Sequence, residues 1–476
     1  MVTQCSRTQV VSDEQWHTVV YRKPVEPLAL AAEALWQIPP VETTRLSEER
    51  GGGSRGRGVM SPVKTLFFCF LCTSSWGSEL GERVQQLMAK YPLIDGHNDL
   101  ALQLRILHDN RLSQIDLYNL SKVATDIHRL QTGHVGAQMF AAYVMCKAQE
   151  KDAVRLTIEQ IDVIRRMCTE YPDLELVTSA QGLMDSRKIA CLMSIEGGHS
   201  IDSSLPTLRM FYQLGVRSMA LTHTCNTPWA KSSSNFYPFY RRENKSLTQF
   251  GKAVVMEMNR LGMIVDLSHS SWETARSVLE ISTAPIIFSH SSAFKVCEHV
   301  RNVPDWLLVM LKKNRGIIMV NMHSGFIACN EKGDVSIVAD HFEHIKKVAG
   351  FESIGIGGDY DGAPKFPDGL EDVSKYPALI EELVRRNWTE HELASILRLN
   401  FLRVFQEVEK VRDEERSQTP SEAQIPLEEA VNPCRLTLTH PVLSSVSGSI
   451  LSLTPSVNVL TCSVVSFVLL LFSTLL

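Results

Sequence analysis

Six short apolar segments of this chain each end on side chains that can bind a metal ion or transfer a proton. In chain order these ends are His97-x-Asp99, Glu196, His223, His269, His290 and Asp359. One histidine after a strand is usually a satisfied structural residue, but a repeated pattern of this kind is hard to attribute to packing. Imidazole nitrogen and carboxylate oxygen are suitable zinc ligands, and open sites with such ligands activate water. The pattern therefore predicts a zinc centre that performs hydrolysis.

The spacing of these residues suggests how they would share metal ions. His97 and Asp99 are two residues apart, so on an extended segment their side chains point to the same side. Glu196 has two carboxylate oxygens and could bridge two ions. His269 and His290 would then complete the second ion's ligands.

Other histidines offer weaker alternatives. His199 lies three residues after Glu196 and could substitute as a ligand. His323 ends another apolar segment and could contact a substrate. His341 and His344 lie in a polar helical stretch, so we expect them at the surface.

The elements that must position these residues are short, almost continuously apolar segments, which is typical of strands buried on both faces of a parallel sheet. They span residues 92–95, 189–196, 216–223, 263–269, 284–290, 316–323 and 353–359. Longer helical patterns separate them, as at 152–167, 247–262, 272–282 and 304–314. Thr389 with Glu392 predicts a capping box, and Ser270 predicts another helix start.

Strand and helix alternate often enough to predict βα units with right-handed crossovers. Seven candidate strands, with room for an eighth, favour a closed (β/α)8 TIM-like barrel over an open doubly wound sheet. No G-x-G-x-x-G follows the first strand, which argues against a dinucleotide-binding fold. In such a barrel all strand ends face one side, where active sites are built.

The chain resembles the membrane dipeptidases (renal dipeptidase type) of the metal-dependent hydrolase superfamily. The resemblance covers roughly residues 80–434. It rests on LIDGHNDL, SIEGGHS, LTHTCNTPWA, VDLSH, IFSHSSA, RNVPD, GIGGDYDG and GLEDVSKYP. It implies two Zn²⁺ ions per subunit. His97, Asp99 and Glu196 would hold one ion, and Glu196, His269 and His290 would hold the other.

The resemblance also implies how a substrate would bind. His223 would contact the substrate, Arg301 would receive its C-terminal carboxylate, and Asp359 would meet its free amino group and handle protons. These roles imply hydrolysis of dipeptides with both termini free. By family likeness, cysteinylglycine conjugates such as leukotriene D4 and some β-lactams would also be substrates.

Cysteines and sequons agree with a secretory route. Four of the 11 cysteines (Cys5, Cys69, Cys72 and Cys462) lie in segments near the chain ends that we expect to be absent from the mature protein. The remaining seven are an odd number, which suggests an intermolecular bond or free thiols. The resemblance implies the disulfides Cys146–Cys225 and Cys297–Cys329, with Cys434 linking two subunits of a homodimer. Cys168 and Cys191 are interpreted as buried thiols. Glycosylation sequons occur at Asn119, Asn244 and Asn387.

The two ends of the chain predict processing signals. Residues 1–59 are interpreted as a disordered upstream extension and 60–78 as a secretory signal peptide. The barrel would span 79–411, and 412–447 would form a stalk or surface-packed segment. Residues 448–476 combine small residues, a spacer and an apolar tail, which predicts a GPI-attachment signal and an extracellular, membrane-anchored enzyme. A tail-anchored helix is the competing interpretation.

The composition argues against nucleic acid as a partner but does not restrict the function further. The chain is 44% hydrophobic and 21% charged with a net charge of −5, and it has no basic stripe interleaved with aromatic residues. Two rival functions stay open: a cell-surface binding protein on an inactive dipeptidase scaffold, and a hydrolase of the same barrel type with another substrate. Blocked and unblocked dipeptides would separate the enzymatic alternatives.

Overall fold

The computed structural model of the chain describes residues 79–234, 236–237, 240, 246–329, 332–430 and 432. The chain divides into two compact units, 1–434 and 435–476, and the second lies outside the described residues. The predicted signal peptide, GPI signal, Cys434 and Asn244 also lie outside them.

Eight parallel strands form a closed barrel, as the sequence predicts. The barrel strands are β1 (Leu93–Asn98), β2 (Val135–Tyr143), β4 (Ile189–Glu196), β5 (Val216–Ala220), β6 (Ile264–Asp266), β7 (Ile287–Phe288), β8 (Ile317–Val320) and β9 (Ile354–Ile356). They are paired in the order β2-β1-β9-β8-β7-β6-β5-β4, and a further pairing of β2 with β4 closes the ring. The short strand β3 (Leu174–Leu176) pairs with the first three residues of β4, Ile189 to Cys191.

Six of the seven predicted segments contain a whole barrel strand, the segment 92–95 covers only the first half of β1, and β2 is the eighth strand. Strand β2 was not singled out because Gly136, Gln138 and several alanines interrupt its apolar character. Its residues are nevertheless nearly all buried, since β1 and β4 flank it on both sides.

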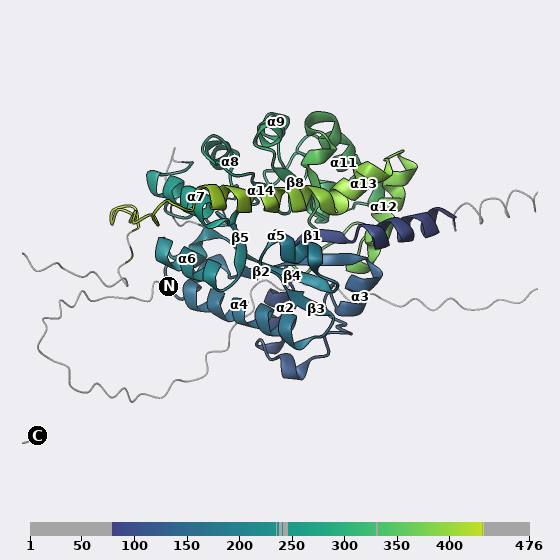
Figure 1. Cartoon of the computed structure of the whole chain (residues 1–476), viewed down its shortest axis with the longest axis horizontal. Helices are drawn as coiled ribbons and strands as arrows, with labels where there is room; N and C mark the ends of the chain where they lie inside the picture. Colours follow the sequence, from purple (N-terminus) through teal and green to yellow (C-terminus); the bar gives the residue numbers. More distant parts are fainter. Residues whose placement is uncertain are drawn as a thin grey trace, which may run out of the picture. The chain divides into compact units, whose positions relative to one another are not determined.

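Helices surround the strands, with α7, α8, α9 and α11 along one side and α2, α4 and α6 along the other (Figure 1). The helices between β1 and β5 are α2 (Leu100–His108), α3 (Ile127–Thr132), α4 (Ala153–Glu170), α5 (Ala180–Asp185) and α6 (Leu205–Gln213). Those that follow are α7 (Gln249–Leu261), α8 (Trp272–Leu279), α9 (Asp305–Asn314), α10 (Ser324–Ile327), α11 (Val335–Ala349), α12 (Tyr376–Arg385), α13 (Glu390–Ala394) and α14 (Asn400–Glu414). None of the helices in the described part of the chain has the length and apolarity to span a membrane.

The core has two parts because every strand is buried on both faces. Alternate residues such as Cys191 and Met193 of β4 pack outward in the cluster shared with the helices. The intervening residues, such as Ala190 and Leu192, belong to a second cluster that fills the barrel, and Phe405 of α14 packs into it. Glu196 continues the inward-facing series of β4 because side chains alternate along a strand. This alternation places its carboxylate at the barrel's mouth.

Helix starts agree with the predictions at one site and differ by one residue at another. Thr389 and Glu392 form the predicted capping box at the start of α13. Helix α8 is capped by Ser271, whose side chain accepts from the Thr274 amide, and not by Ser270. Two adjacent serines offer the same cap, and the sequence alone does not decide between them.

Two predictions about buried groups are wrong. Cys168 and Cys191 are not thiols but form a disulfide that ties α4 to β4, beside the expected disulfides Cys146–Cys225 and Cys297–Cys329. The two cysteines meet because α4 packs its buried face on the outer face of β4. His341 is fully buried rather than at the surface, whereas His344 is partly exposed.

Beyond α14 the described chain stays on the barrel. The Ser421 carbonyl accepts from Arg209 at 3.0 Å, and the Ser421 amide donates to buried Glu257 at 3.2 Å. This part of the C-terminal segment is therefore packed on the surface.

Candidate metal centre and active site

The mouth of the barrel, at the carboxyl ends of the strands, collects the five predicted metal ligands together with His223 and Asp359. His97 lies in β1 and Asp99 directly follows it, while Glu196 ends β4. His269 and Asp359 follow β6 and β9, and both have left-handed backbones with φ of 65° and 59°. Non-glycine residues seldom adopt this conformation, and it marks the sharp turn by which the chain leaves each of these two strands.

Glu196 is the centre of the cluster. Its Oε1 atom lies 3.0 Å from His269 Nε2, 3.4 Å from His290 Nε2 and 3.5 Å from His97 Nε2. His223 Nε2 lies slightly farther away, at 3.7 Å. Four imidazoles from four different strands therefore point their Nε2 atoms at one carboxylate.

Two ligand groups can be distinguished within the cluster. His97, Asp99 and Glu196 have ligand atoms within 4.8 Å of one another, and His97 Nε2 lies 3.1 Å from Asp99 Oδ2. His269 and His290 form a second group around Glu196, with their Nε2 atoms 2.9 Å apart, and the His290 ring also lies 3.8 Å from the His97 ring between centroids. Glu196 Oε1 lies within 3.5 Å of an imidazole nitrogen in each group, so one carboxylate contacts both.

The cluster suits a bound cation because it is buried and one of its ligand oxygens has no partner in the described structure. Asp99 Oδ1 is buried without a hydrogen-bond partner in the described structure, although Asp99 Oδ2 meets His97. An unpaired buried oxygen of this kind costs about 1–3 kcal/mol unless a ligand satisfies it. The imidazole and carboxylate donors are those that Zn²⁺ accepts.

Burial sets the protonation of most groups in the cluster. It lowers the pKa of His223, His269 and His290 well below the usual value, with the Arg301 cation adding to the effect. These three imidazoles therefore stay neutral, which is the form that binds metal. Burial also raises the pKa of Glu196, although the nearby His97 opposes the shift.

His97 and Asp359 respond to their charged neighbours. Burial alone would lower the pKa of His97, but the Glu196 and Asp99 carboxylates raise it to about 10. Burial raises the pKa of Asp359 to about 7, and Asp99 contributes in the same direction. Asp359 also lies within ligand distance of His97 and His290, so it belongs to the same polar cavity.

Arg301 supplies a buried positive charge beside the cluster. Its Nη2 donates to the His290 carbonyl at 3.3 Å and its Nη1 to Ser291 Oγ at 3.5 Å, while its Nε has no partner in the described structure. The guanidinium also lies over the Phe326 ring, 5.4 Å from the centroid. A buried guanidinium with an unused donor is suited to receive a carboxylate.

A buried aspartate holds the first strand in place. Asp95 Oδ1 accepts from the backbone amides of His97 at 3.1 Å and Gly358 at 2.9 Å, and its Oδ2 accepts from the Tyr376 hydroxyl at 2.5 Å. These bonds tie β1 to the segment after β9. They position His97 and Asp359 on neighbouring strand ends.

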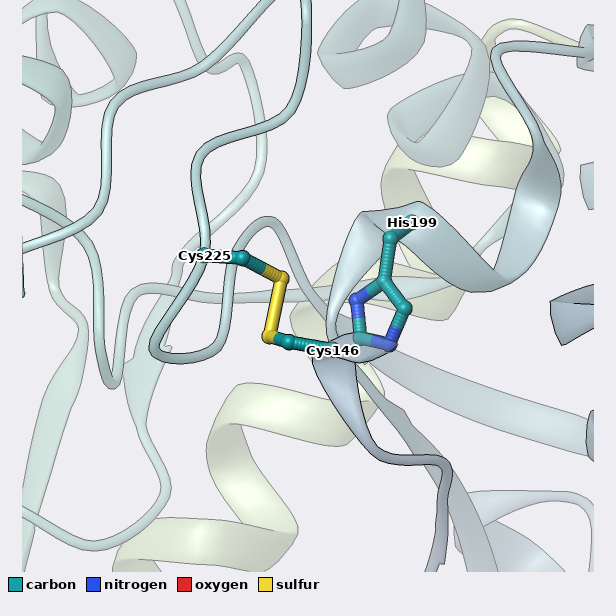
Figure 2. A group of neighbouring side chains, drawn as sticks. All are labelled: Cys146, His199 and Cys225. Carbon is teal, nitrogen blue, oxygen red and sulfur yellow. A yellow bond between two sulfur atoms is a disulfide. The ribbon is translucent and has the colours of Figure 1, made fainter. Parts of the chain in front are cut away.

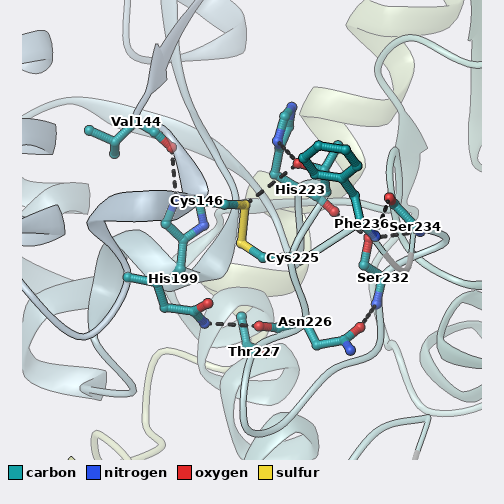
Figure 3. The surroundings of a disulfide bond; sticks show 12 residues. Val144, Cys146, His199, His223, Cys225, Asn226, Thr227, Ser232, Ser234 and Phe236 are labelled. Carbon is teal, nitrogen blue, oxygen red and sulfur yellow. Dashed lines mark hydrogen bonds between the residues drawn. A yellow bond between two sulfur atoms is a disulfide. The ribbon is translucent and has the colours of Figure 1, made fainter. Parts of the chain in front are cut away.

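The Cys146–Cys225 disulfide supports His223 (Figure 3). Thr224 Oγ1 lies 3.6 Å from Cys146 Sγ and 3.1 Å from His223 Nδ1. The Tyr143 ring packs on the other side of His223, with centroids 4.4 Å apart. The orientation of His223 toward Glu196 is therefore held from the loops after β2 and β5.

His199 is not part of the metal cluster. It lies against Cys146 and Cys225 (Figure 2). Its Nε2 bonds the Val144 carbonyl at 2.8 Å (Figure 3). These three residues resemble a Cys₂His ligand set, but both sulfurs are joined in the disulfide. A metal needs the thiolate form, so this group is structural.

Three residues near the site were not singled out from the sequence. Tyr143 is paired in register with Glu196, Phe326 lies under Arg301, and Asp361 has a buried Oδ2 without a partner in the described structure. His323, named as a possible substrate contact, stacks on Phe326 at 4.0 Å and caps α10. Tyr143 ends strand β2, which its glycine and alanines concealed in the sequence.

A cavity of about 660 Å³ lies at the opposite end of the barrel. Its lining includes Pro92, Val135 and Ile189, which lie at or just before the amino ends of their strands, together with Arg398. It contains none of the clustered ligands and is separate from the candidate site.

The fold and this site define a class: a (β/α)8 hydrolase barrel with a metal-binding cluster at the carboxyl ends of its strands. Comparison with known proteins narrows the class. Residues 81–419 match the family described as membrane dipeptidase (peptidase family M19). The chain is 54% identical to human Dipeptidase 3 over 356 residues, covering 75% of this chain and 73% of that protein. It is 53% identical to mouse Dipeptidase 3 over 355 residues, covering 75% and 72%.

Solved structures agree. A dipeptidase described as AC, a metallopeptidase of family M19, superimposes with a TM-score of 0.62 at 25% identity, covering 67% of this chain and 98% of its own. The probable dipeptidase PvdM from Pseudomonas aeruginosa shares the fold, with a TM-score of 0.65 at 18% identity, over 70% and 99%. The chain belongs to the membrane dipeptidase family and is a metallopeptidase of the dipeptidase type.

Proposed function

We propose that this protein is a dizinc dipeptidase that hydrolyses dipeptides with both termini free. The convergence of His97, His269 and His290 on Glu196 Oε1 carries the proposal. Glu196 would bridge two Zn²⁺ ions, with His97 and Asp99 completing one ion's ligands. His269 and His290 would complete those of the other.

The zinc ions, when bound, would polarise the scissile carbonyl and activate a water molecule. The chain's own residues would select and orient the substrate. Arg301 would bind the C-terminal carboxylate, and Asp359 would bind the free amino group and exchange protons with the reacting groups. His223 would stabilise the negative charge that develops on the carbonyl oxygen. Because Arg301 and Asp359 would bind the two charged ends of the substrate, they would limit its length to about two residues.

We further propose the additional substrates, the membrane anchor, the oligomeric state and the glycosylation that are expected from the sequence. Cysteinylglycine conjugates such as leukotriene D4 and some β-lactams would be substrates, because they share the small amide and free carboxylate. The enzyme would be a GPI-anchored cell-surface homodimer linked through Cys434, with Asn244 also glycosylated. Asn119 and Asn387 are exposed, which is compatible with glycosylation of both.

The rival function is a receptor on an inactive scaffold. It would not require all five proposed metal ligands together with Arg301 and Asp359 in one buried cluster. Their presence favours the enzyme.

The test is hydrolysis of glycyl dipeptides by the purified chain as prepared, after chelation and after zinc is restored, with Glu196→Gln alongside. We expect activity that disappears on chelation, returns with zinc and is absent from the variant. No turnover by folded, fully metallated protein would contradict the proposal and favour the receptor.

A further inference from the structure

A chain of hydrogen bonds runs from a buried carboxylate to one imidazole of the metal cluster. Asp266, the last residue of β6, is buried, and its Oδ2 accepts from the Ser289 hydroxyl at 2.5 Å. Ser289 Oγ in turn lies 2.8 Å from His290 Nδ1. The other oxygen, Asp266 Oδ1, accepts from the backbone amides of Ser268 at 2.9 Å and Ser289 at 3.0 Å.

The direction of each proton in this chain can be derived. Asp266 is a carboxylate, which accepts hydrogen bonds and donates none, so the single hydroxyl hydrogen of Ser289 points to Asp266 Oδ2. Ser268 Oγ, the other possible acceptor, is 3.4 Å away, whereas Asp266 Oδ2 is at 2.5 Å. Ser289 Oγ can then only accept from His290. The His290 proton therefore lies on Nδ1, and Nε2 carries the free lone pair.

We propose that Asp266 and Ser289 are positioning residues that hold His290 in the Nδ1–H tautomer and so present its Nε2 lone pair to the metal centre. The inference rests on the dizinc site proposed above, because it assigns His290 Nε2 as a ligand. His269 provides a contrast, since its Nδ1 is buried without a partner in the described structure. The protein thus fixes the tautomer of one of these two neighbouring imidazoles through its own side chains.

The Asp266→Asn variant should reverse the chain. The two backbone amides require an acceptor at the Oδ1 position, so the amide oxygen of the variant takes that place and its NH₂ group faces Ser289 Oγ. The Ser289 hydroxyl then donates to its nearest remaining acceptor, His290 Nδ1 at 2.8 Å, in preference to Ser268 Oγ at 3.4 Å. This forces the His290 proton onto Nε2, where it blocks the lone pair. Ser289→Ala removes the link without imposing the wrong tautomer, so its effect should be smaller.

Two measurements test the inference on purified protein. The first is the ¹⁵N spectrum of histidine-labelled, metal-free protein, with His290 assigned by its loss in His290→Gln. We expect the wild type to be protonated at Nδ1 and Asp266→Asn at Nε2. The second is zinc affinity by competition with a chromophoric chelator. One of the two ions should bind about 10–100-fold more weakly to Asp266→Asn, as is usual when an outer partner of a metal ligand is lost.

Ser218→Ala serves as the matched control for Ser289→Ala. Ser218 is also a buried strand serine, but its hydroxyl bonds only the Ile264 carbonyl at 3.3 Å. It should leave both zinc affinities unchanged. Thermal unfolding of each metal-free variant reports whether it is folded.

The outcomes separate this inference from the proposed function. A wild type that binds no zinc overturns the dizinc site, yet the histidine spectrum still tests the tautomer. If Asp266→Asn is folded and His290 keeps its proton on Nδ1, the relay is wrong. Affinities for both ions within threefold of the wild type would also overturn it, even if the enzyme is a dizinc dipeptidase.

Discussion

Arg301 is buried without an acidic partner at ion-pair distance among the described residues, and its Nε makes no hydrogen bond there. Desolvation of a cation is costly unless a ligand or neighbouring groups compensate for it. Burial lowers the pKa of Arg301, while Asp359 and Glu196 partly oppose this effect. The residue is therefore placed to gain most when a substrate carboxylate arrives.

Arg301→Lys keeps the positive charge but loses the planar fork that can make two parallel bonds to a carboxylate. We expect kcat/KM for glycyl dipeptides to fall about 10–100-fold, because a hydrogen bond to a charged group contributes about 1.5–3 kcal/mol. The same dipeptides with an amidated C-terminus are the control and should be cleaved equally poorly by both enzymes. An equal loss on both substrate types would contradict the assigned contact.

At the scale of elements, α11 shows how packing overrides a polar sequence pattern. His341 lies among charged residues of α11 but is fully buried. Its Nδ1 accepts from the Ala293 amide at 3.0 Å, and its Nε2 donates to the Ile327 carbonyl at 2.9 Å. A satisfied neutral imidazole thus ties α11 to the loop after β7 and to α10.

Burial lowers the pKa of His341 to about 4. In the unfolded chain the value is about 6.5, so between these pH values only the unfolded state gains the proton. This stabilising contribution is complete above about pH 6.5 and is lost as the pH falls toward 4. We expect the difference in the free energy of unfolding between pH 7 and pH 4.5 to be about 2 kcal/mol smaller in His341→Gln.

Urea unfolding at pH 7, 5.5 and 4.5 measures this difference. His344→Gln is the matched control, since His344 lies three residues away on the same helix with a partly exposed side chain. Its Nε2 lies 2.7 Å from Asp305 Oδ1, so the comparison separates the buried ring of His341 from a partly exposed His–Asp contact on the same helix. If His341→Gln has the same pH dependence as the wild type, His341 has the same protonation in the folded and the unfolded protein, which would contradict the prediction.

At the scale of the molecule, the barrel brings together ligands that are up to 193 positions apart, from His97 to His290. The mutual repulsion of these buried ligands and the loss of their hydration lower the stability of the folded state. A bound metal ion would relieve both effects. A ligand that binds only the folded state adds about 2.7 kcal/mol of stability per site at a hundredfold excess over its dissociation constant.

We therefore expect chelation to lower the melting temperature by several degrees and zinc to restore it. Differential scanning calorimetry of the wild type and Glu196→Gln tests this. The variant should show little dependence on zinc because it lacks the shared ligand. A wild-type melting temperature that is indifferent to chelator and zinc would contradict a metal bound at this cluster.

Much of this architecture is visible in the sequence. Strands buried on both faces leave uninterrupted apolar segments, and parallel strands put their carboxyl ends on one side, so both the barrel and the gathering of His97, Glu196, His269 and His290 could be predicted. Strand β2 could not be, because its alanines and glycine lack the β-branched residues that mark a strand.

Only the tertiary structure decided which neighbours these residues meet. The Cys168–Cys191 disulfide depends on α4 packing against β4, and the burial of His341 depends on α10 and the loop after β7 covering it. The order of protons from Asp266 through Ser289 to His290 likewise depends on two strand ends lying side by side. Sequence periodicity records which face of an element is apolar, whereas partners across elements are set by how those faces pack.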